Sequence, residues 1–173
     1  MEEKDLQSFD MEESSLPVIS LEGSEIVRRQ YLSHIKENIV TIRPNGIQFN
    51  NSCILRMEGV THIHLIMNRS KKWLIIRGCD EDDRDGQRWC IVNEDKRKSR
   101  MINGSEYSER VYKLMDWSKG YYYKICGTLA VQADKRDTLL LVFDLSEAEV
   151  YPMTAKSREA AGVIDEDLGP NEL

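Results

Sequence analysis

The 173-residue sequence has no hydrophobic run of the roughly 18–20 residues that a membrane-spanning helix needs. Its first residues, MEEKDLQSFDMEESS, are acidic and have neither the basic start nor the apolar centre of a secretion signal. The four cysteines include no Cys-x-x-Cys pair. These absences predict a cytoplasmic protein with no membrane partner, whose cysteines are reduced and mostly buried thiols rather than disulfides or metal ligands.

Charge is distributed unevenly along the chain, whose formal net charge is -6. Residues 1–24 hold seven acidic residues and one basic residue, and residues 146–173 hold seven acidic and two basic residues. Subtracting these segments, at -6 and -5, leaves +5 for residues 25–145. We therefore expect a basic body between acidic, flexible tails, which can lie over a basic surface and compete with a polyanion for it.

The periodicity of apolar residues changes along the first half of the chain. Residues 24–38 have helical spacing, after which the pattern alternates as in a strand. Asn45-Gly46 is a strong hairpin-turn signal. A short helix capped by Asn50 or Asn51 follows, and THIHLIMN-RSKK-WLIIRGC then predicts a β-hairpin.

The second half repeats this order of turn, helix, strand and hairpin, although few letters are identical and chance agreement is the alternative. Each unit has an apolar face that must be buried, so we expect the two units to pack against each other as one domain. The predicted fold class is α+β, a single domain of two pseudo-repeated β-α-β-β units with an N-terminal helix and acidic flexible tails. The expected segments are an arm at 1–23, a domain at 24–151 with units at about 39–79 and 99–145, and a tail at 152–173.

Basic residues occur mainly at a predicted hairpin tip and in the polar stretch KRKSR. Basic loops that project from a sheet suit contacts with DNA phosphates, while the alternative is an ordinary solvated surface. The candidate DNA-binding residues are Arg43, Arg69, Lys71, Lys72, Arg77, Lys96, Arg97, Lys98 and Arg100.

Other motifs give weaker signals. His62 and His64 share one face of a strand, but no third ligand follows at a recognised metal-site spacing. Residues 81–86, EDDRDG, match the start of a calcium loop, whose twelfth position is Val92 instead of glutamate. The tyrosines of 121–124, YYYK, suit either base stacking or a core. We predict no metal and no cofactor.

Two families are similar in sequence. Residues 41–79 resemble the swapped-hairpin transition-state-regulator module, which binds DNA as a dimer, although its usual proline before the helix is absent here. SEIVRRQYLSHIKEN, THIHLIMN, IRGCDEDDRDGQRWC, MDWSKGYYYKICGTL and FDLSEAEVY resemble a small protein family of Gram-positive mobile elements whose members are often labelled "integrase". The second resemblance implies association with a mobile element and supplies no catalytic residues.

The label can be compared with the chemistry that it requires. A tyrosine recombinase needs a His-x-x-Arg box, and no histidine here is followed three residues later by arginine. We therefore expect no enzyme, but a non-catalytic accessory protein that binds DNA, or the recombination or transcription machinery acting on it, such as a recombinase or regulator protein. The alternative is a protein-interaction module without nucleic-acid contact, and a catalytic integrase is the least favoured reading.

Overall fold

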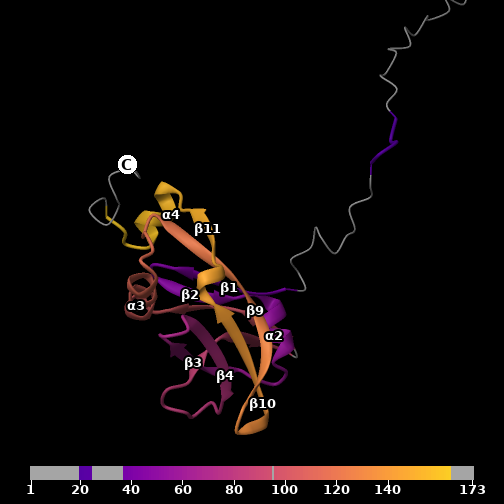
Figure 1. Ribbon diagram of the computed structural model, residues 1–173. Coiled ribbons are helices and arrows are strands. Elements are labelled where there is room, and N and C mark those ends of the chain that lie inside the picture. Colours follow the sequence, from indigo (N-terminus) through magenta and orange to yellow (C-terminus); the bar gives the residue numbers. More distant parts are fainter. Residues whose placement is uncertain (1–19, 25–36, 95, 165–173) are drawn as a thin grey trace, which may run out of the picture. The chain divides into compact units, whose positions relative to one another are not determined.

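The computed structural model describes residues 20–24, 37–94 and 96–164 (Figure 1). The chain divides into two units, residues 1–32 and 33–173, and every helix and strand described belongs to the second. The elements are β1 Asn38–Arg43, β2 Gly46–Phe49, α2 Asn51–Arg56, β3 His62–Asn68, β4 Trp73–Cys79, β5 Gln87–Arg88, β6 Cys90–Asn93, β7 Lys96–Ser99, β8 Met101–Asn103, α3 Ser105–Met115, β9 Tyr121–Gln132, β10 Lys135–Asp144, a 3-10 turn at Leu145–Glu147, β11 Glu149–Pro152 and α4 Ala155–Ala160.

One antiparallel sheet dominates the described structure. Its strand order is β5-β3-β4-β10-β9-β1-β2-β8, and β11 pairs with β9 outside this path. The sheet curves into a nearly closed, barrel-like arrangement, and the described helices are short. In Figure 1 the long strands β9 and β10 cross the body, with α3 to one side and α2 to the other.

The predicted α+β class is wrong, because the protein is mostly β. The hairpins β3–β4 and β9–β10 do not form separate layers, since β4 pairs directly with β10 and places Leu74 opposite Phe143. Most of the expected N-terminal helix, residues 25–36, lies outside the described residues, and Asn38 already belongs to β1. The expected arm also lies outside them up to residue 19.

Two further segments differ from the sequence prediction. Residues 96–99, expected in a polar loop, form β7 and pair with β6 as a separate two-stranded ribbon. Residues 152–164, expected at the start of a flexible tail, contain the end of β11, the buried Met153 and the helix α4. Thr154 caps α4 by accepting a hydrogen bond from the Ser157 backbone N–H. Residues 165–173 lie outside the described part of the chain.

Local signals in the first half are confirmed. The expected first hairpin is present, with Ile42 paired to Ile47, but its two turn residues are Pro44 and Asn45, one position earlier than predicted, because Gly46 already belongs to β2 and pairs with Arg43. Asn50 caps α2, since its side-chain oxygen accepts from the Cys53 N–H. The expected hairpin is present as β3 and β4.

Aromatic side chains join the strands across the core. Phe49 lies between Trp89 and Phe143, with ring centroids 5.5 and 5.7 Å away. Trp117 stacks on Tyr123 at 3.9 Å. Edge and stacked contacts of this kind add about 0.5–1.5 kcal/mol each to the burial of apolar surface. The core therefore links residues from both halves of the chain, because Phe49 and Phe143 belong to β2 and β10.

The cysteines lie in different surroundings. Cys53 and Cys90 are buried, Cys79 is half-buried and Cys126 is exposed, and all four are free thiols. Burial raises the pKa of Cys53 to about 12. Among the described residues, none of the helices has both the length and the apolar character that crossing a membrane requires.

Candidate functional site

The predicted DNA-binding residues lie in several separate regions. Arg43 ends β1, and its guanidinium carbon lies 4.9 Å from the centre of the Tyr122 ring. The turn between β3 and β4 carries Arg69, Lys71 and Lys72, all exposed. Lys71 lies over the Trp73 ring, with its Nζ 4.5 Å from the centroid. The structure therefore does not bring all nine candidates to one surface.

The segment Lys96–Arg100, here called the β7 strip, alternates between exposed and half-buried side chains from Lys96 to Ser99, and Arg100 is half-buried as well. Lys96 and Lys98 are exposed, whereas Arg97 is half-buried. The Arg97 guanidinium donates hydrogen bonds of 3.0 Å to the backbone carbonyls of Met57 and Val60. Arg97 thus joins β7 to the segment that follows α2, and its guanidinium is hydrogen-bonded within the protein.

Three cationic side chains do line one groove, between the β3–β4 turn and α3. This Arg69 groove has a volume of about 420 Å³. Arg69 comes from the turn, while Arg110 and Lys113 come from successive turns of α3. The remaining lining residues are apolar or aromatic: Met67, Tyr107 and Leu114.

The charges of the Arg69 groove are only partly compensated. Arg110 is paired with Glu106, one helical turn before it, at 2.7 Å. Both side chains are well exposed, so the pair contributes little to stability. Among the described residues, no carboxylate lines the groove itself. Arg69 and Lys113 therefore present positive charge over an apolar floor.

Tyr107 lies between the Arg69 groove and a second concavity of about 650 Å³ near the N-terminus of α3. Its hydroxyl is sealed from solvent and has no hydrogen-bond partner among the described residues. Burial raises the pKa of this phenol to about 12, so the group stays neutral and able to donate. The second concavity is mixed in charge, since Asp85 and Glu106 line it together with Arg110.

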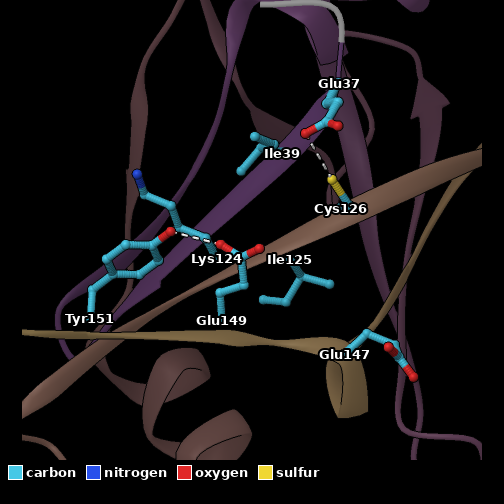
Figure 2. Close-up of a pocket in the computed structure, with 8 residues that line it drawn as sticks. All are labelled: Glu37, Ile39, Lys124, Ile125, Cys126, Glu147, Glu149 and Tyr151. Atoms are coloured by element: carbon cyan, nitrogen blue, oxygen red, sulfur yellow. Dashed lines mark hydrogen bonds between the residues drawn. The ribbon is translucent and has the colours of Figure 1, made fainter. Parts of the chain in front are cut away.

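A small cavity of about 130 Å³ lies against β1, β9 and β11 (Figure 2). Glu37, Glu147 and Glu149 surround it, and Lys124 is its single cationic lining residue among those described. The Cys126 thiol donates to Glu37 at 3.5 Å. Burial, followed by the effect of Glu37, raises the pKa of Cys126 to about 11, so this thiol is not a nucleophile near neutral pH.

Beside this cavity, Tyr122 and Tyr151 stack with their ring centres 5.3 Å apart. Lys124 Nζ lies 4.9 Å from the centre of the Tyr151 ring, and Arg43 covers Tyr122. The Tyr151 hydroxyl donates to Glu149 (Figure 2). This face combines aromatic rings with cations, but the cations already lie on the rings and carboxylates border them. Stacking of nucleic-acid bases needs ring faces that are free, so this face is poorly suited to it.

A different cluster forms where β3 and β4 meet the loop after β4. His64, Cys79 and Asp83 each offer one potential ligand atom, and these three atoms lie within 4.8 Å of one another. His64 Nε2 lies 3.0 Å from Asp83 Oδ1. On the other side of the ring, Arg77 donates to His64 Nδ1 at 3.2 Å and to Gln132 at 3.4 Å.

These contacts fix the tautomer of His64, because a guanidinium can only donate. Nδ1 therefore accepts from Arg77, and Nε2 carries the proton and donates it to Asp83. That hydrogen bond lowers the pKa of the Asp83 carboxyl below its usual range. Burial, with help from Asp83, raises the pKa of the Cys79 thiol.

The cluster does not have the geometry of a Cys-His-Asp triad. In a triad the histidine bridges the nucleophile and the acid. Here both ring nitrogens of His64 are occupied by Asp83 and Arg77, and the Cys79 thiol is neutral at ordinary pH. The residue types instead match a set of metal donors.

Two parts of these sites were missed by the sequence reasoning. Arg110 and Lys113 are not among the candidate residues from the sequence, and nothing in the sequence placed them beside Arg69. Cys79 was expected only as one of the mostly buried thiols, and Asp83 only as part of the stretch compared with a calcium loop. Their spacing of four residues, Cys-x-x-x-Asp, following a strand that pairs with His64, is the signal that was available.

Comparison of the chain with protein-family models, with curated proteins and with solved structures finds no match. The arrangement of residues in these sites is therefore the structural basis for assigning a function.

Proposed function

We propose that the protein is a non-catalytic, cytoplasmic DNA-binding protein that holds the phosphate backbone in the Arg69 groove. The observation that supports this proposal is the convergence of Arg69, Arg110 and Lys113 from two separate elements on one groove. Guanidinium and ammonium groups bind phosphate oxygens without reading sequence, so the groove suits backbone binding. Association with a mobile element is part of the proposal and rests on the sequence resemblance alone.

The groove also has features that suit a polyanion better than a small neutral ligand. Its three cations are exposed, and Arg110 and Lys113 lie about one turn apart along α3. The apolar floor of Met67 and Leu114 offers contact for sugar carbons. Binding should therefore be strongly salt-dependent, because each neutralised phosphate releases condensed counterions.

A salt titration with a random-sequence DNA duplex, followed by fluorescence anisotropy, tests the proposal. Replacing both Arg69 and Lys113 by alanine should reduce affinity at low salt by roughly 10-fold or more. It should also lower the slope of log K against log salt by about 1.8, since each lost phosphate contact removes about 0.9.

The matched control is the double change Lys96→Ala and Lys98→Ala. It removes the same charge from exposed positions of the β7 strip. The proposal expects the control to keep the wild-type slope. No binding of the wild type at low salt, or equal losses in both double variants, would show that the groove does not bind DNA.

A second candidate function, a protein-interaction module, is favoured by a different observation. The distal part of the β9–β10 hairpin exposes Leu129, Val131 and Leu139. Affinity capture from host lysate, with and without nuclease, distinguishes the two functions. Partners that persist after nuclease treatment and are lost in a Leu129→Ser/Val131→Ser variant would support protein interaction. Partners lost on nuclease treatment would support the DNA proposal.

A further inference from the structure

We propose that His64, Cys79 and Asp83 form a binding site for a zinc-type divalent metal ion, with a fourth position left for water. The three side chains come from β3, from the last residue of β4 and from the loop that follows. This site is independent of the Arg69 groove and would be added to the DNA-binding function. It departs from the sequence-based expectation that the protein holds no metal.

The donor atoms select the class of metal. Zinc is bound in proteins by imidazole nitrogen, thiolate sulfur and carboxylate oxygen, usually in tetrahedral geometry. Calcium and magnesium prefer oxygen ligands alone, so the thiol and the imidazole disfavour them. Three protein ligands with one open position is a coordination pattern that zinc commonly adopts.

The distances need little change on binding. With bonds of about 2.0 Å, a tetrahedral zinc ion holds nitrogen and oxygen ligands about 3.3 Å apart. His64 Nε2 and Asp83 Oδ1 are already 3.0 Å apart. The largest separation within the trio is at most 4.8 Å, so the thiol has to approach by at most about 1.3 Å to reach the roughly 3.5 Å that a Zn–S bond imposes.

The loop after β4 is folded so that it holds Asp83 over Cys79. Its turn contains hydrogen bonds from the Asp83 N–H to the Asp80 carbonyl at 3.2 Å and from the Gly86 N–H to the Asp83 carbonyl at 3.0 Å. Asp83 Oδ1 also accepts from the Asp85 N–H at 2.9 Å. A Cβ at Gly86 would lie 2.8 Å from Cys79 Sγ, so only glycine lets the loop approach the sulfur so closely.

Coordination requires a defined exchange of protons. The metal would take the Nε2 position, the ring proton would move to Nδ1, and the Cys79 thiol would release its proton to solvent. Nδ1–H can no longer accept from Arg77, so the guanidinium would have to leave the ring. Arg77 keeps a partner, because its other terminal nitrogen already donates to Gln132. The contact between His64 and Asp83 would thus give way to a bond from each of them to the metal.

Cobalt(II) is the probe for the site, because its thiolate complexes have a charge-transfer band and tetrahedral sites have intense visible bands. The full chain is titrated with cobalt(II) under reducing conditions, and zinc is then added to displace it. We expect one equivalent to bind, with a sulfur band that zinc removes. Cys79→Ser should abolish that band, and Asp83→Asn should weaken zinc binding by at least about 10-fold, since even outer-shell changes cost that much.

Matched controls use neighbouring residues of the same type. Cys126→Ser removes an exposed thiol, and Asp85→Asn alters a carboxylate two residues from Asp83; both should bind as the wild type does. Because Asp83 and Asp85 lie in a surface loop, these two variants remain informative if Cys79→Ser fails to fold. A wild-type chain without the cobalt–sulfur band, or equal losses in Asp83→Asn and Asp85→Asn, would overturn the proposal.

Discussion

The β7 strip and the Arg69 groove show opposite relations between charge in the sequence and charge in space. The strip has four basic residues within five positions, yet Arg97 is bound to carbonyls and Arg100 is half-buried, which leaves Lys96 and Lys98 as its exposed cations. The groove draws its three cations from positions 69, 110 and 113, and all three are exposed. The DNA site proposed above therefore rests on convergence of charges in space and not on their density in the sequence.

The largest expected effect on stability comes from removing the hydrogen-bonded guanidinium of Arg97 in the β7 strip. Arg97→Ala should lower the free energy of unfolding by about 1–3 kcal/mol, because two charge-assisted hydrogen bonds are lost. The loss is limited because Val60 O still accepts from Trp89 Nε1 and Met57 O still accepts from the Val60 N–H. Urea denaturation measures it.

Lys98→Ala is the control for Arg97→Ala, since Lys98 is exposed on the same strand. Its effect should stay within about 0.5 kcal/mol. Equal destabilisation by the two changes would mean that Arg97 has no special structural role, and the comparison of strip and groove would fail.

A smaller effect is expected behind the groove, at Tyr112 on α3. Its hydroxyl donates to the Tyr121 carbonyl at 2.7 Å, which ties the helix to β9. Tyr112→Phe should lower the free energy of unfolding by about 0.5–1.5 kcal/mol, the usual value of such a hydrogen bond. Denaturation of the purified variant, with an unchanged m-value, would verify a local loss.

The smallest effect is expected at Tyr107, whose hydroxyl has no partner among the described residues. Tyr107→Phe removes an unsatisfied buried group, so stability should be unchanged or rise by up to about 1 kcal/mol. Tyr107→Phe and Tyr112→Phe remove the same group, and only the hydroxyl of Tyr112 has a hydrogen-bond partner in the described structure. A loss at Tyr107 as large as that at Tyr112 would show that the floor of the groove is hydrogen-bonded in solution.

The sequence predicts the local parts of this fold well. The Pro44-Asn45-Gly46 stretch marks the first hairpin to within one residue of its turn, Asn50 gives the cap of α2, and alternating residues give β3 and β4. These features depend on a few adjacent residues, whose turn geometry and capping chemistry are known.

Pairing between distant strands could not be predicted in this way. The contacts of β4 with β10 and of β1 with β9 join segments that have no mark of one another in the sequence. They merge the expected units into one curved sheet and make the protein mostly β. The sites share this limit, because Lys113 reaches Arg69, and Asp83 reaches His64, only after the sheet has formed.

The position of β9 also has a consequence for the growing polypeptide during synthesis. Val40 of β1 pairs with Ile125 of β9, 85 positions later in the chain. At a translation rate of about 5–20 residues per second, the outer edge of β1 waits roughly 4–17 s for its partner. The edge of β4 waits similarly, since Ile76 pairs with Leu141. Unpaired edges recruit other chains, so the interval before β9 and β10 emerge is when a nascent copy most needs shielding from its neighbours.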